Sequence, residues 1–201
     1  MRKSRSSFHH SLRLAAVLVG CAAFSLFAAD RCIQPGEHIP DFSLPAVRGD
    51  SFHLHAPDVQ PALLAFLQSV PDTADTPSRS QVAQLQSMDH QYRARGLRVV
   101  IIDATALATG SKPDHNSLIN ASYDWNLQIP LLEDENGSVA RMIGVTHLPT
   151  TILVAADGRA AQVWERPVPP GVMAVAIETA FGSGPLVPRS TPQDRTKPPV
   201  R

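Results

Sequence analysis

The sequence predicts an α/β fold in which one mixed sheet carries helices on both faces. The continuous apolar run 62–67 has the length and composition of a central strand that is buried on both sides, and residues 97–102 form a second, strongly apolar strand. Between them, apolar residues recur every three to four positions, which indicates an amphipathic helix. Further along, Asp157-Gly158 joins two short apolar segments as an antiparallel hairpin turn. Strands that alternate with helices and end in a hairpin predict a single mixed-sheet domain.

The first 29 residues are predicted to be an export signal or a membrane anchor. They contain four basic residues and no acidic one, and an apolar run extends from Leu14 to Ala29. This run is shorter than the roughly 20 residues that a spanning helix needs. Leu18-Val19-Gly20-Cys21 resembles a lipoprotein box in which Cys21 would carry the lipid. Ordinary cleavage nearby and an uncleaved anchor are the alternatives.

The rest of the chain is mildly acidic. The whole chain has 18 basic and 18 acidic residues, so removing the four leader cations leaves 14 against 18, a formal charge of −4 for residues 30–201. No basic face of the kind that binds nucleic acid is evident, so nucleic acid is not expected as a partner. With 201 residues, 43% of them hydrophobic, the chain can bury one full-sized core.

The domain is predicted to span residues 30–182 and to begin with an extended segment and a β-hairpin. Gly49-Asp50 is the hairpin signal, and residues 52–55 alternate after it. In this alternation His53 and His55 face the same side of the strand. Two histidines fall short of a metal site, so they are interpreted as solvated, and neither a metal nor another cofactor is expected.

The helix between the two central strands is predicted from Ser78 to Arg95, with Gly96 as its stop signal. After the second central strand, residues 106–116 are predicted to form a loop. Asp114 is the expected N-cap of a short helix that ends near Trp125. A brief extended segment is expected at 129–132.

The last part of the domain is predicted to contain two more helices and the hairpin. The expected elements are a helix near Ser138–Ile143, a strand at Thr150–Ala155, its hairpin partner at Ala160–Trp164 and a closing helix near Val172–Phe181. Residues 183–201 contain five prolines and no aromatic residue. That composition is typical of a disordered tail.

This order of elements resembles the thioredoxin-like redoxins, specifically the alkyl hydroperoxide reductase/thiol-specific antioxidant (AhpC/TSA) and TlpA-like group. Gly36–Leu44 is similar to their N-terminal opening, Ala62–Phe66 to the strand before the catalytic loop, and Gly96–Asp103 to the strand after the first helix. The most specific match is Gly144-Val145-x-x-Leu148-Pro149-Thr150-Thr151, with Asp157-Gly158 behind it. The resemblance covers residues 34–182 and implies a thioredoxin-like fold.

By this resemblance Pro149 would be the family's cis-proline, which faces the redox sulfur. Its loop would expose the backbone of Leu148 for strand-like pairing with a partner, with His147 and Thr150 on either side. An ordinary trans proline at the start of a strand is the alternative. His147 is interpreted as a surface histidine in preference to a general base, because no nucleophile accompanies it in the sequence.

The sequence departs from the family where the catalytic cysteine belongs. No cysteine follows Cys32, and residues 68–80 offer hydroxyls, carboxylates and an arginine instead. Asp75-Thr76-Pro77 faintly resembles the D-T-P-x-C of thiol peroxidases. The positions that match the redox loop are therefore Thr76, Ser78, Arg79 and Ser80. A serine cannot form a disulfide, and without an adjacent base it is not a comparable nucleophile.

Cys32 is the only cysteine after the leader. It stands at the start of the domain, where chain ends are seldom tied down, so it is interpreted as an unpaired residue in a mobile tail. Its free thiol is the remaining candidate for redox chemistry in this chain.

These observations lead to functional hypotheses of different classes. The first is an exported thioredoxin-fold protein, periplasmic or attached to the membrane facing the periplasm, that is redox-inactive and binds a protein or peptide beside Pro149. The second is a thiol-disulfide oxidoreductase or peroxidase-type redoxin that uses Cys32 or a partner's cysteine. A third is a membrane-tethered module whose Pro-rich tail docks another protein.

Overall fold

The structure is a computed structural model that describes residues 31–55, 60–70 and 77–182. The leader 1–29 with its Cys21 and the tail 183–201 lie outside the described residues, so the predictions made for them stay predictions. Within the described ranges, no helix is long and apolar enough to cross a membrane.

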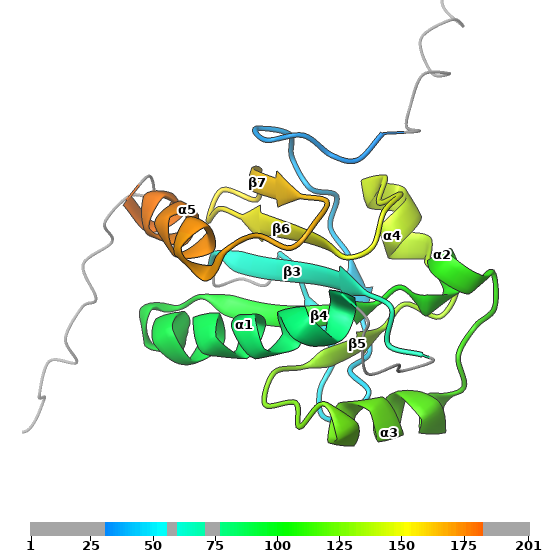
Figure 1. The fold of residues 1–201 in the computed structure, drawn as a ribbon. Coiled ribbons are helices and arrows are strands. Elements are labelled where there is room, and N and C mark those ends of the chain that lie inside the picture. The colour runs from blue at the N-terminus through cyan, green and yellow to red at the C-terminus, as the bar shows by residue number, and fades with distance from the viewer. Residues whose placement is uncertain (1–30, 56–59, 71–76, 183–201) are drawn as a thin grey trace, which may run out of the picture.

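A five-stranded mixed sheet forms the centre of the domain, with the strand order β5-β4-β3-β6-β7 (Figure 1). β3 (Ala62–Leu67) is parallel to β4 (Arg98–Asp103), which is parallel to β5 (Leu131–Glu133). β6 (Thr150–Val154) runs antiparallel to β3, and β7 (Ala160–Trp164) runs antiparallel to β6. The predicted mixed sheet is confirmed, and the two apolar runs form neighbouring strands inside it.

Helices cover both faces of this sheet, as predicted. One apolar cluster joins α1 (Pro77–Tyr92), α3 (His115–Asp124) and α5 (Pro170–Gly182) to one face. A second cluster joins α4 (Ser138–Ile143) and the N-terminal segment to the opposite face. Side chains alternate between the faces of a strand, which explains why β3 feeds both clusters. Leu64 and Phe66 enter the α4 cluster, whereas Leu63, Ala65 and Leu67 enter the α1 cluster.

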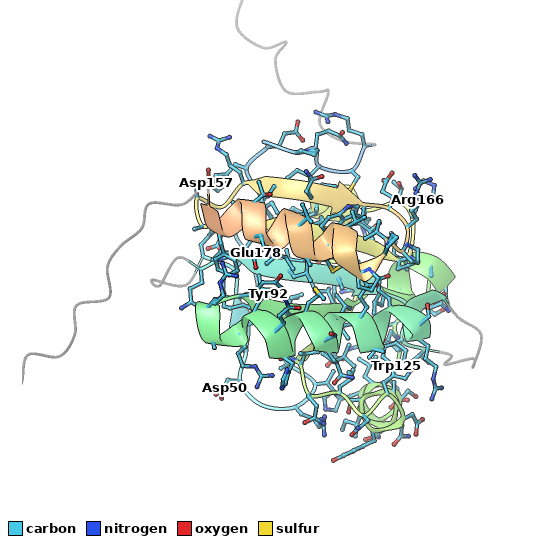
Figure 2. All side chains as sticks on the ribbon, turned by 60° about the vertical axis from the view of Figure 1, so that its left-hand side comes forward. Asp50, Tyr92, Trp125, Asp157, Arg166 and Glu178 are labelled. Atoms are coloured by element: carbon cyan, nitrogen blue, oxygen red, sulfur yellow. The ribbon has the colours of Figure 1, made fainter. Side chains whose placement is uncertain are left out.

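α1 and α5 lie side by side over their face of the sheet. Figure 2 labels Tyr92 and Glu178 where the two helices face each other. The Tyr92 ring stacks on Phe181 with 6.2 Å between the ring centroids. Arg95 Nη1 donates to Glu178 Oε1 at 2.6 Å. These contacts attach the closing helix to the end of α1.

A small antiparallel hairpin precedes the main sheet, as predicted. It consists of β1 (Ser43–Leu44) and β2 (Phe52–His53), with Ser43 opposite His53. Leu44 and Leu54 are buried in the cluster that contains α4. The N-terminal segment and its hairpin therefore cover the face of the sheet that α1 leaves open.

The boundaries of the central helix differ little from the prediction. α1 ends at Tyr92, and a 3-10 turn at Arg93–Arg95 continues the coil. Gly96 then terminates it at a φ of 97°, a conformation that glycine adopts without strain.

The prediction of a loop over residues 106–116 is wrong in part, because α2 (Thr105–Thr109) lies inside it and α3 already begins at His115. The carbonyl of Ala104 accepts from the N–H groups of Leu107 at 3.0 Å and Ala108 at 3.2 Å, which closes the first turn. The predicted cap of α3 is confirmed: the Asp114 carboxylate accepts from the N–H groups of Asn116 at 2.9 Å and Ser117 at 3.3 Å.

Candidate functional site

The candidate site lies where β3 and β4 end and β6 begins. In the sheet, Leu67 is opposite Asp103, and Phe66 is opposite Thr150. The segment before β6 therefore meets the segment after β3 at one edge of the sheet. In open α/β sheets, ligands bind at this carboxyl edge of the parallel strands.

A hydrogen bond within the segment 147–150 holds its backbone at this edge of the sheet. The Leu148–Pro149 peptide bond is cis, and Thr150 donates its hydroxyl to the carbonyl of His147 at 2.7 Å. Pro149 and Thr150 are buried, whereas Leu148 is half-buried and packs against the α4 cluster. The His147 side chain is 71% exposed, and its Nδ1 lies 3.9 Å from Glu165 Oε1. The turn thus presents His147 and part of Leu148 on a fixed backbone.

The start of α1 contains three of the four positions that are predicted to match the family's redox loop. Thr76 lies outside the described residues, Ser78 belongs to the first turn of the helix, and Arg79 and Ser80 are exposed. Arg79 Nη2 donates to the carbonyl of Asp124 at 3.4 Å, which connects it to the end of α3.

Gln81 connects α1 to β6 directly. Its side chain is 2% exposed, and its Nε2 donates to Thr151 Oγ1, one residue after Thr150. Its Oε1 is buried and has no hydrogen-bond partner among the described residues. The sequence patterns do not single out Gln81, although one signal was present. Gln81 stands four residues before the buried Leu85, so it lies on the apolar stripe of the helix.

A buried polar cluster holds the chain just after β3. Asp103 Oδ1 accepts from the Thr105 hydroxyl at 2.6 Å and from the Ser69 N–H at 3.3 Å. The Thr105 hydroxyl oxygen accepts in turn from the N–H groups of Ser69 and Val70, each at 3.1 Å. These bonds fix the chain at Ser69 and Val70, where the predicted redox loop begins.

Two buried polar atoms of this cluster lack a hydrogen-bond partner among the described residues. Asp103 Oδ2 and Ser69 Oγ are buried and make no hydrogen bond of normal geometry with the described residues. Burial raises the pKa of Asp103, and the nearby Thr105 and Ser69 hydroxyls oppose that shift without cancelling it. The sequence predicts the strand before Asp103 but not this role, because the partners come from two segments that lie more than 30 positions apart, as the Ser69–Asp103 bond spans 34.

Cys32 is buried, so the interpretation as part of a mobile tail is wrong. It is 4% exposed and unpaired. Two contacts attach its segment to α4: Ile33 N–H donates to the Ile143 carbonyl at 3.0 Å, and the Arg31 carbonyl packs against Gly144. A Cβ on Gly144 would lie 2.1 Å from the Arg31 oxygen, so this approach requires glycine.

The surroundings of Cys32 keep its thiol protonated. Burial raises the pKa of the thiol, and the negative charge of Glu165 raises it further. Cys32 belongs to the apolar cluster against which Leu148 packs, so it is on the loop's side of the sheet. The thiolate is the nucleophilic form of cysteine, and this site disfavours it.

The strand alternation places His53 and His55 on one side of the strand, but the histidine that lies beside His55 in the structure is His38. His53 is exposed on β2, whereas His55 lies beside His38 with 5.2 Å between the ring centroids. Across the described ranges, no group of three or more histidine, cysteine, aspartate or glutamate side chains is arranged to hold a metal ion.

The chain is similar in sequence to thiol-disulfide oxidoreductases. The chain is 23% identical over 166 residues to the thiol-disulfide oxidoreductase ResA of Bacillus thuringiensis subsp. konkukian, covering 81% of this chain and 88% of that relative. It is 24% identical over 154 residues to the ResA of Halalkalibacterium halodurans, covering 76% and 81% respectively.

Among solved structures, a putative thiol:disulfide interchange protein DsbE from Chlorobium tepidum has a TM-score of 0.64 at 20% identity. The match covers 75% of this chain and 99% of that one, which confirms the thioredoxin-like fold. The AhpC/TSA family itself matches residues 35–163, more than half of the chain. The chain is therefore a member of the AhpC/TSA family.

Proposed function

We propose that this protein binds an extended segment of a protein or peptide beside the loop 147–150 and does not itself exchange thiols. One contrast carries the proposal. The loop 147–150 corresponds to the loop that faces the redox sulfur in redoxins. It is held by the hydrogen bond from Thr150 to His147, and the next residue, Thr151, is bonded to Gln81 of α1. Residues 68–80, by contrast, contain no cysteine. The relatives named as thiol-disulfide oxidoreductases support a protein as the partner.

Binding at this loop does not depend on sulfur. An extended peptide pairs with exposed backbone groups through hydrogen bonds and places alternate side chains into neighbouring apolar surface. Half-buried Leu148 offers such a surface, and exposed His147 offers a polar group beside it. Backbone pairing and apolar contact remain available when thiol exchange is lost.

The location of the protein is part of the same proposal. The basic and apolar leader 1–29 would export the domain 30–182 to the periplasm or tether it to the membrane there. In this proposal the Pro-rich segment 183–201 is a disordered tail.

The test uses a thiol-free unfolded polypeptide, reduced and carboxymethylated α-lactalbumin, and measures its Kd for the full chain by fluorescence anisotropy. Leu148→Asp places a charge on the proposed contact surface, and we expect it to weaken binding at least about tenfold. Met142→Asp is the matched control, because Met142 is an exposed apolar residue on α4 outside the loop. Equal Kd values for both variants would argue against this binding site.

A second function is supported by one observation: Cys32 shares its apolar cluster with Leu148. If the segment around Cys32 detached from α4, the thiol would be near the loop and could act as a redoxin thiol. In that case peroxide treatment of the native protein would leave a sulfenic acid or a mixed disulfide at Cys32, detectable by mass spectrometry. An unmodified Cys32 would exclude this function.

A further inference from the structure

Two imidazoles from separate segments face the same point beside the turn between β6 and β7. His38 precedes β1, His55 follows β2, and Gly158 is in the turn that Asp157 marks in Figure 2. A methyl group built on Gly158 would lie 2.7 Å from His55 Nε2 and 3.1 Å from His38 Nε2. A side chain at position 158 would therefore clash with both rings, and the φ of 79° favours glycine there as well.

The contacts of the His55 ring occupy one of its nitrogens and leave the other without a hydrogen bond. Its Nδ1 lies 3.3 Å from Asp41 Oδ1, and the same carboxylate oxygen accepts from the His55 N–H at 3.2 Å. A hydrogen on Nδ1 that points to the carboxylate leaves Nε2 with a free lone pair. His55 Nε2 is buried and has no hydrogen-bond partner in the described part of the chain.

We propose that His38 and His55 bind a divalent transition-metal ion through their Nε2 atoms. With metal–nitrogen bonds of about 2.1 Å in a tetrahedral site, two imidazole centroids stand about 5 Å apart. The observed separation is 5.2 Å, with the ring planes tilted by 39°. A carboxylate on the other ring nitrogen, as Asp41 provides for His55, is the usual second partner of a metal-binding histidine.

The donor set defines the class of ion. Imidazole nitrogens suit copper, nickel and zinc, and affinity along this series is highest for Cu²⁺. Mg²⁺ and Ca²⁺ prefer oxygen ligands and are not expected here. Two protein ligands do not complete a metal site, so water would fill the other positions from the side of the exposed His38, and the affinity is modest. A bound ion would connect the segment before β1 to the segment after β2, next to the β6–β7 turn.

The experiment titrates the full chain with Cu²⁺ and, separately, with Zn²⁺ by isothermal calorimetry. All proteins carry His9→Gln and His10→Gln, so that the leader imidazoles do not contribute. The test variants are His38→Gln, His55→Gln and Asp41→Asn. His53→Gln is the matched control, because His53 is an exposed histidine two residues from His55.

We expect one Cu²⁺ per chain, bound more tightly than Zn²⁺, with a rise in Tm on binding. Each of the two test histidine variants should weaken the Kd at least about tenfold, and Asp41→Asn about 10- to 100-fold. The His53→Gln Kd should be unchanged. Absence of saturable binding, or a loss in His53→Gln equal to that in His38→Gln, would overturn the proposal. His38 is exposed, so that variant keeps its fold, which circular dichroism verifies.

Discussion

Gln81 on α1 donates its side-chain N–H to the hydroxyl of Thr151 at the start of β6. Both residues are buried. The bond therefore joins the helix that follows the cysteine-free loop to the strand that follows the cis-proline. In this way the two sides of the candidate site are held together without a disulfide or a thiol contact.

Removal of this bond is expected to weaken both the fold and the site. Gln81→Ala leaves the buried Thr151 hydroxyl without its partner, so the free energy of unfolding should fall by about 1–3 kcal/mol. Binding of carboxymethylated α-lactalbumin should weaken as well. Urea unfolding and fluorescence anisotropy measure the two effects.

Gln84→Ala is the control for this prediction. Gln84 Nε2 donates to the Val168 carbonyl at 3.0 Å, and Val168 is half-buried in a segment outside the site. Water can replace the lost donor there, so we expect a smaller loss of stability and unchanged binding. Equal Kd values for Gln81→Ala and Gln84→Ala would show that Gln81 does not support the binding site.

Gly144 is expected to hold the N-terminal segment in place. Its φ is 76°, and a Cβ would lie 2.1 Å from the Arg31 carbonyl oxygen, so Gly144→Ala should force this segment away from α4. Gly110→Ala is the matched control, because its φ is 72° but a Cβ there meets nothing within 4 Å. The control should lose about 1–2 kcal/mol from backbone strain alone, and Gly144→Ala clearly more. Similar losses for the two variants in urea unfolding would contradict the contact.

The Cys32 thiol is expected to be unreactive in the native protein. Its raised pKa lowers the thiolate fraction at any pH, and burial blocks access to reagents. In a Cys21→Ser background, which leaves Cys32 as the single thiol, Ellman's reagent at pH 8 should react on the order of 100-fold more slowly with the folded chain than with the urea-unfolded chain. Gly144→Ala should speed the native reaction, whereas Gly110→Ala should not. A native thiol that reacts as fast as the unfolded one would revive the second function.

Asp103 should make stability depend on pH in a defined direction. Below the ordinary aspartate pKa of about 3.9, the carboxyl is protonated in both the folded and the unfolded chain. As the pH rises, the unfolded chain ionises first, because burial raises the pKa of Asp103 in the folded one. The free energy of unfolding of the wild type should therefore fall relative to Asp103→Asn until the pH passes the folded pKa.

The size of this difference reports the pKa of the folded carboxyl. Each unit between the folded and unfolded pKa corresponds to about 1.4 kcal/mol. Thermal unfolding of wild type and Asp103→Asn from pH 3 to pH 8 measures the difference directly. A difference that stays constant with pH, or grows in favour of the wild type, would show that the buried carboxyl is not destabilising.

The regular elements are predictable from the sequence because their signals are local. The apolar run of β3, the glycine that ends α1 and the capping carboxylate of Asp114 each act within a few residues. Helix α2 is not predictable in this way, because its five residues, Thr105–Thr109, are too few to show a periodic apolar pattern.

The contacts of the site are less predictable because they join distant segments. Gln81 reaches Thr151 across 70 positions, and Ser69 reaches Asp103 across 34. Alternation along a strand pairs His53 with His55, but the partner of His55 is His38 from another segment. In the sequence Cys32 stands at the start of the domain, and the contacts that bury its segment, the Ile33–Ile143 hydrogen bond and the close approach at Gly144, come from a part of the chain more than 100 positions away.

The most direct test of binding without thiol exchange is the reduction of insulin disulfides by dithiothreitol, followed by turbidity. Wild type and Cys32→Ser are assayed side by side. The account predicts that both proteins leave the rate equal to that of dithiothreitol alone. A wild-type acceleration that Cys32→Ser abolishes would contradict it and establish this chain as an active thiol-disulfide oxidoreductase.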